Sequence, residues 1–342
     1  MTDGHARARF AELCDTVAAA RRVVAVGSRT QWEVGGPPPR DAQEVRVPAG
    51  VITYDPDDLT ATVAAGTTCA ELAAVLAAQG QECPLDPRDP DATVGGVIAC
   101  GLSGWRRLRA GPLRDRVLEV RFVTADGRLV KGGGPTVKNV SGYDLPRLLV
   151  GSFGTLGVIA QVTLRCQPRP VASTWCTTAL DPFMVRAAVL RPVCILRDEA
   201  STRVLLEGEA ADVAHDLAAL GATECATPTL PEGAHRGRIS APPAELPALL
   251  AGLGATGVSW AAELGVGTVH VAAGSPAAAL AARTAAEEQG GWMLREAGLP
   301  GDDGFGVPLP NAALLRRIAD AFDPDGRCAP GRLPLEERAG VV

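Results

Sequence analysis

Hydrophobic residues in the first half of the chain alternate between helical and strand spacing. Apolar side chains recur three and four positions apart in residues 10–22, and a short β-branched run over residues 23–26 ends at Gly27. The first pattern is typical of an amphipathic helix and the second of a strand that enters a turn. Similar runs predict further strands over residues 51–54, 61–64, 117–124 and 129–131.

Capping residues and alternation define two more elements. Thr68 and Glu71 are spaced as a capping box, and Gly80 follows the last apolar position, so we expect a helix over residues 69–79. Apolar and polar residues alternate strictly over residues 158–165. That pattern predicts a half-buried strand.

The second half alternates strand patterns with alanine-rich helical patterns, which is typical of a compact α+β domain. These elements are expected at residues 203–208, 210–220, 244–253, 258–262, 267–272 and 276–289. Prolines at positions 168 and 170 favour an extended linker before them. We therefore predict an N-terminal domain over residues 1–168, a second domain over 169–310, and a C-terminal helix and tail over 311–342 that return to the first domain.

Composition and charge exclude several classes of protein. The chain of 342 residues is 46% hydrophobic and carries a net charge of −6 without a long basic run, which disfavours nucleic-acid binding and a polybasic membrane anchor. Its longest apolar stretch has about half the length of a membrane helix, and the first residues lack the apolar core of a secretory signal. We expect a cytoplasmic protein without direct membrane insertion.

The nine cysteines are scattered and include no Cys-x-x-Cys pair. Closely spaced thiols are the usual sign of an iron–sulfur or zinc site. We therefore interpret these cysteines as small buried hydrophobic residues in a reducing compartment, and we predict no metal site.

The densest chemical signal is the small-residue stretch 92–104, which has neither helix nor strand character in the sequence. Glycines without a Cβ can direct consecutive N–H groups at one point and form a nest for a pyrophosphate. A tight structural crossing would produce the same composition, so the stretch alone leaves both interpretations open.

Two further segments favour the ligand-binding interpretation. Residues 27–31 add hydroxyls and backbone donors directly after a predicted strand. Residues 137–144 lead into three glycines, at positions 151, 154 and 157, whose spacing does not fit a helix interior. Such a loop suits close contact with a flat ring system, and Ile159 adds an apolar edge.

Neither of the common nucleotide fingerprints is present. The sequence contains no G-x-x-x-x-G-K-[ST] and no strand–G-x-G-x-x-G–helix unit. Nucleoside triphosphatase and ordinary NAD-binding domains are therefore disfavoured.

Taken together, these segments resemble the FAD-binding domains of the vanillyl-alcohol oxidase and p-cresol methylhydroxylase (PCMH) type. The resemblance covers most of residues 20–168 and is strongest to the FAD-binding subunits of bacterial glycolate oxidases, in the segments 92–104, 111–115, 137–144, 151–159 and 322–332. It implies an α+β fold: a two-subdomain PCMH-type FAD-binding domain followed by a smaller α+β, ferredoxin-like cap domain. It also implies oxidation of a 2-hydroxy acid such as glycolate.

The resemblance assigns roles by motif. Residues 27–31 and 95–104 would hold the pyrophosphate, the glycines near position 154 would lie along the ribityl and adenine portions, and the loop 138–144 would support the flavin. The implied cofactor-binding residues are Gly27, Ser28, Arg29, Thr30, Gln31, Thr93, Gly95, Gly96, Ala99, Gly101, Ser103, Gly104, Lys138, Gly142, Tyr143, Gly154, Gly157 and Ile159. The first loop lacks the His of covalently flavinylated relatives, so FAD is expected to bind non-covalently.

Candidates for substrate chemistry are fewer. Metal-dependent relatives carry a Gly-His…Gly-Asp-Gly-Asn…His motif, whereas residues 262–270 lack the upstream His and the Asp-Asn pair. His270 is a candidate base, and Arg295 could pair with a substrate carboxylate. Both also fit ordinary structural roles, His270 as a polar residue on a strand and Arg295 as a surface arginine.

Three hypotheses follow for the function. The first is an FAD-dependent 2-hydroxy acid dehydrogenase subunit that passes electrons to a partner. The second is a non-catalytic FAD-binding subunit for assembly or electron relay beside a catalytic sister flavoprotein. A self-contained sugar or alditol oxidase is the third, disfavoured by the low aromatic content of 4%. In the first two, the partners would be a sister flavoprotein and an iron–sulfur subunit, through which the chain could associate with a membrane.

Overall fold

The computed structural model describes residues 3–37, 40–134, 143–299 and 304–335. The chain divides into two compact units. Unit 1 comprises Met1–Ser103, Pro112–Pro168 and Pro308–Val342, and unit 2 comprises Gly104–Gly111 and Arg169–Val307.

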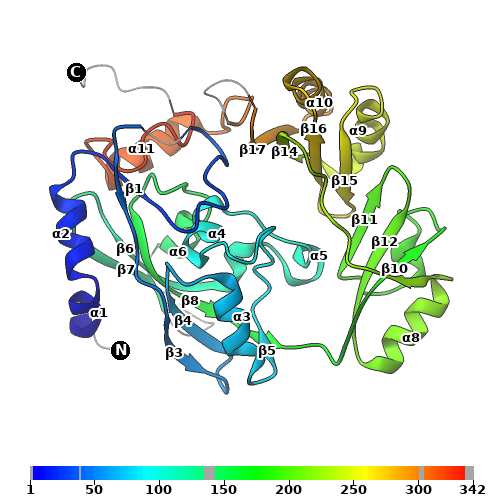
Figure 1. Cartoon of the computed structure of the whole chain (residues 1–342), viewed down its shortest axis with the longest axis horizontal. Helices are drawn as coiled ribbons and strands as arrows, with labels where there is room; N and C mark the ends of the chain where they lie inside the picture. Colours follow the sequence, from blue (N-terminus) through cyan, green and yellow to red (C-terminus); the bar gives the residue numbers. More distant parts are fainter. Residues whose placement is uncertain (1–2, 38–39, 135–142, 300–303, 336–342) are drawn as a thin grey trace. The chain divides into compact units, whose positions relative to one another are not determined.

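Unit 1 is built on a five-stranded antiparallel sheet (Figure 1). The strands, in spatial order, are β3 Val51–Asp55, β4 Thr60–Ala64, β8 Val158–Arg165, β6 Val117–Val123 and β7 Leu129–Gly133. The tight turn between β6 and β7 contains Gly127, whose φ of +82° requires the left-handed region that glycine adopts without strain.

Helices cover both faces of this sheet. One face packs on a core shared by α3 Cys69–Ala77, α4 Val94–Cys100 and α6 Leu145–Leu149, and the other packs on α2 Ala11–Ala19. The strand predicted over residues 158–165 is present as β8, but the prediction that it is half-buried was wrong. Every residue of β8 except Arg165 is buried. β8 is a central strand, so its polar positions are enclosed as well as its apolar ones.

The glycine-rich stretch 92–104, expected to lack regular structure, contains helix α4. The Thr93 side chain caps this helix by accepting a hydrogen bond from the Gly96 N–H, and Gly101 ends it with a φ of +69°. Val97 and Ile98 are buried in the core of unit 1. Capping and burial outweigh the poor helix propensity of the two internal glycines.

The C-terminal segment completes unit 1. Helix α11 Ala312–Phe322 packs Phe322 against the central core, with the Phe322 ring 6.0 Å from that of Phe122. After this helix, the backbone of Cys328 pairs with that of Val23 in an isolated parallel β-bridge. This bridge lies beside the two-stranded parallel sheet of β1 and β2. The remaining elements of unit 1 are α1 Asp3–Arg9, β1 Val23–Ala25, β2 Gln43–Val45, β5 Gln81–Glu82, η1 Leu113–Arg116 and β9 Gln167–Pro168.

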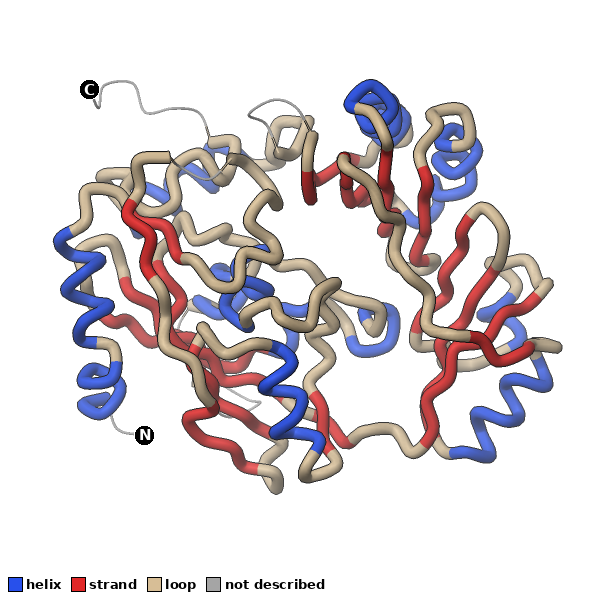
Figure 2. Tube along the Cα trace, viewed as in Figure 1, coloured by secondary structure: helices blue, strands red, loops and turns tan. Residues whose placement is uncertain are grey.

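Unit 2 contains an eight-stranded antiparallel sheet, drawn in red with its helices in blue in Figure 2. The strands in spatial order are β13 Thr223–Cys225, β10 Ala172–Thr178, β12 Thr202–Gly208, β11 Cys194–Asp198, β15 Ser259–Glu263, β16 Thr268–Ala273, β14 His235–Ser240 and β17 Trp292–Ala297. The helices are α5 Arg107–Ala110, α7 Val185–Ala188, α8 Ala210–Ala219, η2 Pro243–Glu245, α9 Leu246–Leu253 and α10 Pro276–Glu288.

The sheet of unit 2 consists of two halves with the same topology. Each half runs strand, helix, strand, strand, helix, strand, and its fourth strand lies outside the first. The halves are joined where β11 pairs with β15, the second strand of each. No sequence repeat signals this duplication, because the two halves share an order of elements and not a residue pattern.

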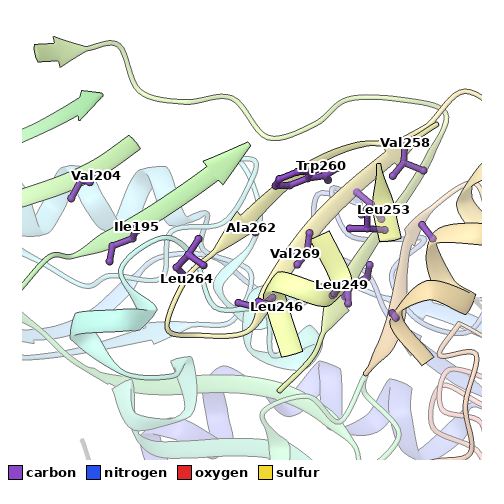
Figure 3. Packing of buried hydrophobic residues seen from close by; sticks show 14 of the residues in the cluster. Ile195, Val204, Leu246, Leu249, Leu253, Val258, Trp260, Ala262, Leu264 and Val269 are labelled. Carbon is purple, nitrogen blue, oxygen red and sulfur yellow. The ribbon is translucent and has the colours of Figure 1, made fainter. Parts of the chain in front are cut away.

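The main core of unit 2 lies between this sheet and its helices. Its buried residues include Ala262, Leu264 and Val269 of β15, β16 and their turn together with Leu246 and Leu249 of α9, all labelled in Figure 3. The segment 104–111, predicted to belong to the first domain, belongs to unit 2. Its Leu108 packs against this core, and its Trp105 packs against a second apolar cluster that includes Trp175.

Among the helices that the structure describes, none has the length and hydropathy that crossing a bilayer requires.

Candidate functional site

Unit 1 contains a pocket that encloses about 850 Å³ of space, part of it open to solvent. Six parts of the chain line it: β1 with the loop that follows, the residue Val47 after β2, the residues 65–66 after β4, helix α4, the turn before β8 with the start of that strand, and the C-terminal tail. The lining residues predicted from the sequence are Gly27, Ser28, Arg29, Thr30, Gln31, Thr93, Gly95, Gly96, Ala99, Gly154, Gly157 and Ile159. Segments far apart in the chain therefore meet at one pocket.

The first loop and helix α4 touch at Gly27. A Cβ placed on Gly27 would lie 2.2 Å from the Thr93 Oγ1, the atom that caps α4. Only glycine allows this approach. The Gly27 carbonyl in turn accepts a hydrogen bond from Arg46 Nη1 at 3.0 Å, which ties the loop to the segment that follows β2.

The two glycines of α4 have different surroundings. A Cβ on Gly95 would collide with Ala65, at 2.7 Å from its Cβ and 2.9 Å from its carbonyl oxygen. A Cβ on Gly96 would meet only Thr93 Oγ1 at 3.1 Å and Gln31 Oε1 at 4.0 Å. Gly95 thus permits close packing of the fold, whereas Gly96 keeps the wall of the pocket open.

The turn before β8 brings more backbone to the pocket. Gly154 and Gly157 both line it with positive φ angles of +79° and +138°. The Phe153 N–H donates to the Ala99 carbonyl at 2.8 Å, so this turn is fixed to α4. Gly101 lies behind the wall of the pocket and allows close packing there. A Cβ on Gly101 would lie 2.8 Å from the Cα of Gly151.

Two side chains give the pocket polar character. Gln31 Oε1 is a buried acceptor without a hydrogen-bond partner among the described residues, so it can receive a donor from a ligand. Arg332 is buried in the wall and donates from Nη1 to the carbonyls of Trp32 at 2.8 Å and Gly36 at 3.0 Å. Its guanidinium places a permanent positive charge at the pocket.

Two non-glycine residues of the lining adopt left-handed backbone conformations. Arg29 has a φ of 63° and Phe153 a φ of 54°. Such residues are uncommon and concentrate where the chain must follow a required shape, as at ligand-binding sites. The Arg29 side chain is held by Glu44 at 2.6 Å and lies 4.6 Å above the Trp32 ring.

Several predicted cofactor-binding residues lie elsewhere. The buried Ser103 hydroxyl accepts a hydrogen bond from the Leu113 N–H, Gly104 belongs to unit 2, and the Tyr143 side chain is 92% exposed. None of these three, nor Gly101, lines the pocket. Lys138 and Gly142 fall outside the described residues.

The sequence reasoning missed the lining residues Trp32, Phe153 and Arg332. A signal existed for two of them, because Phe153 stands between predicted glycines and Arg332 ends the Pro-Gly-Arg of the C-terminal signature. Trp32 directly follows the predicted loop 27–31, but no residue pattern separates it from an ordinary surface tryptophan.

The candidate base lies in unit 2. His270 on β16 is buried, and its Nε2 lies 2.8 Å from Oε1 of the equally buried Glu263 on β15. The Trp105 ring centroid is 6.0 Å from that of the imidazole. Sequence reasoning missed Glu263, because a single Glu in a strand pattern carries no sign of a buried partner.

The fold does not place Arg295 and His270 on the same face of the sheet. Met293 packs in the core on the helix side of the sheet, and Arg295, two residues later on β17, shares that face. Val269 and Val271 pack in the same core, so His270 between them points to the opposite face. Arg295 instead lies near its own loop, with Nη1 3.5 Å from the Leu299 carbonyl.

The buried cysteines are held in the thiol form. Burial, reinforced by Asp86, raises the pKa of Cys69 to about 12, and burial with Asp323 raises the pKa of Cys328 to about 12. A protonated thiol is a poor nucleophile and a poor metal ligand. Among the described residues, no group of three or more His, Cys, Asp or Glu side chains could hold a metal ion.

The pocket of unit 1 fits a dinucleotide with a flat ring. Glycine backbone at Gly27 and Gly96 allows close approach of phosphates, the Arg332 guanidinium offsets their charge, and the Gln31 acceptor suits a sugar hydroxyl. The apolar edge near Phe153 and Ile159 suits a planar ring.

Comparison with known proteins agrees with this chemistry. Residues 9–133 match a family model described as FAD binding domain. The glycolate oxidase subunit GlcE of Escherichia coli K12 is 41% identical over 153 residues, which are 44% of this chain and 44% of that protein. A D-lactate dehydrogenase of Archaeoglobus fulgidus is 44% identical over 118 residues, 34% of this chain and 27% of the relative.

A third relative, the glycolate oxidase subunit GlcD of Bacillus subtilis, is 36% identical over 121 residues, 35% of this chain and 26% of that protein. Each match spans less than half the length of the curated relative. Among solved structures, an alkyldihydroxyacetonephosphate synthase has a TM-score of 0.67 at 14% identity, covering 94% of this chain and 74% of the other, which shows a shared fold. The chain thus carries an FAD-binding domain over residues 9–133, and FAD is its cofactor.

Proposed function

We propose that this chain is the FAD-binding subunit of a glycolate oxidase-like 2-hydroxy acid dehydrogenase complex. The observation that carries the proposal is that Gly27, Gly96 and Gly154 line one pocket, within a domain whose relatives include glycolate oxidase subunits and D-lactate dehydrogenases. Bound FAD supplies a hydride acceptor for oxidation of the hydroxy acid.

The residues of unit 1 would hold the cofactor non-covalently. The loop 27–31, Thr93 and Gly96 would bind the pyrophosphate together with Arg332, and Gly154, Gly157 and Ile159 would line the ribityl and adenine portions. The segment 138–144, most of which lies outside the described residues, would support the flavin. The role of unit 2 would be that of the cap, with two ferredoxin-like halves that supply substrate-handling residues.

His270 would act as the base that accepts the hydroxyl proton of the substrate. For the substrate carboxylate, Arg238 is a better candidate than Arg295. Arg238 on β14 is buried and stands directly opposite His270 in the strand register, so the two side chains share one face of the sheet. Its planar guanidinium suits bidentate pairing with a carboxylate.

We further propose that electrons pass to partner subunits. The relative from E. coli is named as a subunit, which supports a hetero-oligomer with a sister flavoprotein. An iron–sulfur subunit is proposed as the next carrier, because the cysteines of this chain lack the spacing of cluster ligands. The complex is proposed to be cytoplasmic, with any membrane contact made by partners.

A second function, a non-catalytic subunit for assembly or electron relay, is favoured by one observation. The two residues first expected to handle substrate, His270 and Arg295, lie on opposite faces of the sheet and cannot act on one molecule. In that case the sister flavoprotein would carry out the substrate chemistry.

Anaerobic titration of the purified chain tests the two functions. Addition of glycolate or D-lactate should bleach the flavin absorbance if the chain is catalytic. Bleaching only in the presence of the sister subunit would support the relay function and contradict the catalytic one. A chain purified without flavin would contradict both.

A further inference from the structure

Two cysteines of unit 1 lie opposite each other near the point where the chain leaves this unit. Strands β5 and β9 form a two-stranded antiparallel sheet in which Glu82 pairs with Gln167. The two side chains follow this register, since Gln167 Nε2 donates to Glu82 Oε1 at 3.0 Å. The next step of the same register places Cys83 opposite Cys166.

The two cysteines occupy a position without hydrogen bonds between the opposed residues. Pro168 has no N–H, so its pairing with Gln81 is of the non-hydrogen-bonded kind, and the two kinds of pair alternate along a ladder. Cys83 and Cys166, two steps further, are of the same kind. In agreement, the Cys166 N–H donates to the Leu59 carbonyl at 2.7 Å. Opposed Cα atoms at such positions are about 4.5 Å apart, which a disulfide can span.

Both side chains point to the same core. Cys166 is a buried member of the main apolar core of unit 1, and the partly exposed Cys83 packs against it. Burial, and after it the proximity of Cys166, raises the pKa of the Cys83 thiol well above its ordinary value. Cys69 lies in the same core but has a smaller influence on that pKa. All three are free thiols in this structure.

A second pair of cysteines on neighbouring strands lacks this arrangement. In unit 2, β10 and β13 pair so that Trp175 opposes Cys225 and Cys176 opposes Glu224. Cys176 packs in the main core of unit 2, whereas Cys225 packs on the cluster that contains Trp175. The two thiols therefore lie on opposite faces of their sheet and serve as a control.

We propose that Cys83 and Cys166 form a modification site at which hydrogen peroxide converts the two thiols to a disulfide. Cys83, the more exposed, reacts first: its sulfur attacks a peroxide oxygen, the O–O bond breaks and water leaves, which gives a sulfenic acid. The Cys166 sulfur then attacks Cys83 Sγ, so that an S–S bond forms, the S–O bond breaks and a second water leaves. The two electrons pass from the thiols to the peroxide.

The disulfide would close a loop that holds much of unit 1. The enclosed residues 84–165 include α4, β6, β7 and β8. Two parts of the pocket wall, α4 and the turn before β8, lie within this loop. A cross-link stabilises a fold mainly by restricting the unfolded chain, and more so for a long loop. Oxidation at this site should therefore make unit 1 more resistant to unfolding.

Mass spectrometry of the full-length chain tests the bond. The chain is treated with hydrogen peroxide, its remaining thiols are alkylated, and it is digested without reduction. Cleavage by Glu-C separates Cys83 from Cys69, and cleavage by chymotrypsin separates Cys166 from Cys176. We expect peptides joined through Cys83 and Cys166 that dithiothreitol separates. A bridge from Cys83 to Cys69, or Cys83 oxidised to a sulfinic acid without a bridge, would overturn the assignment.

The rate of bridging should depend on pH. The thiolate is the attacking form, and the pKa of Cys83 lies above the range from pH 7 to pH 9. Over that range the rate should rise about 10-fold per pH unit. No bridge between Cys83 and Cys166 even at pH 9 would overturn the proposal.

Urea unfolding followed by circular dichroism tests the consequence. Oxidation should raise the urea midpoint of the wild type by about 1 M. Cys83→Ala and Cys166→Ala should each abolish this shift, whereas Cys176→Ala and Cys225→Ala should retain it. Each variant is compared with its own reduced form, so any loss of stability from the substitution itself cancels. An equal shift in Cys83→Ala would contradict a disulfide at this site.

Discussion

The pocket of unit 1 and the His270–Glu263 pair of unit 2 represent two ways of building a polar site. The pocket consists mainly of backbone exposed by glycines at Gly27, Gly96 and Gly154, and these glycines are grouped in short segments of the chain. The pair consists of side chains from two strands among apolar neighbours. A backbone site leaves a clear pattern in the sequence, whereas a side-chain site is formed by strand register.

The largest expected effect is on the free energy of unfolding, and it shows whether the buried His270–Glu263 pair stabilises the fold. Glu263→Leu leaves His270 without its partner and should lower the free energy of unfolding by about 3–5 kcal/mol. The double variant Glu263→Leu with His270→Leu removes both polar groups and should be close to the wild type or more stable. Urea unfolding followed by circular dichroism measures both. A double variant as unstable as the single one would mean that the pair stabilises the fold.

Gly96→Val should affect the pocket in the opposite way, by weakening binding without unfolding the domain. The added side chain enters the pocket beside Thr93 and Gln31, and we expect FAD to bind at least about 100-fold more weakly, or about 2.7 kcal/mol. Gly4→Val is the control, because nothing lies within 4 Å of a Cβ there. Fluorescence titration with FAD gives the affinity. An unchanged Kd for Gly96→Val would contradict the assignment of Gly96 to the wall of the FAD pocket.

Arg332 tests the side-chain contribution to the pocket. Arg332→Leu removes the positive charge that would offset the phosphates, together with the hydrogen bonds that fix this part of the pocket wall to the carbonyls of Trp32 and Gly36, and should weaken FAD binding by about 1.5–3 kcal/mol. In the same titration, Arg22→Leu should change binding little, since the Arg22 side chain forms an exposed ion pair with Asp41 and does not line the pocket. Equal changes of the FAD affinity in the two variants would contradict a role for Arg332 in FAD binding.

The smallest effect concerns pH. The folded-state pKa values of Cys69 and Cys328 are raised to about 12, above the ordinary thiol value, so the folded state binds more protons than the unfolded chain at alkaline pH. Stability should be complete below about pH 8.5 and fall as the pH rises towards 12, with each thiol contributing about 1 kcal/mol of loss by about pH 9. Cys328→Ala should reduce this slope in urea titrations at several pH values, and an unchanged slope would contradict the assignment.

The same contrast explains what could be predicted from the sequence. The helix predicted over residues 69–79 is present as α3 Cys69–Ala77, and its capping box is formed as expected, because local hydrogen bonds determine both. Helix α4 was missed, because burial of Val97 and Ile98 outweighs the preference of its glycines. The prediction that β8 is half-buried was also wrong. Alternation of apolar and polar residues cannot show that a strand lies in the middle of a sheet with both faces covered.

Long-range placement accounts for the remaining differences at the sites. Arg295 and His270 were both reasonable candidates by residue type, but their strands direct them to opposite faces. The register of β14, β15 and β16 places Arg238 and Glu263 on the same face of the sheet as His270, and no local pattern encodes that register. The segment 104–111 joins unit 2 for the same reason, through Trp105 and Leu108.

The central claim is that unit 1 holds FAD without a covalent bond. The direct measurement is heat denaturation of the purified chain, removal of the precipitate, and quantification of flavin in the supernatant against protein. The account predicts one FAD per chain, released entirely into the supernatant. Flavin that remains with the precipitated protein, or a chain that cannot be loaded with FAD, would contradict it.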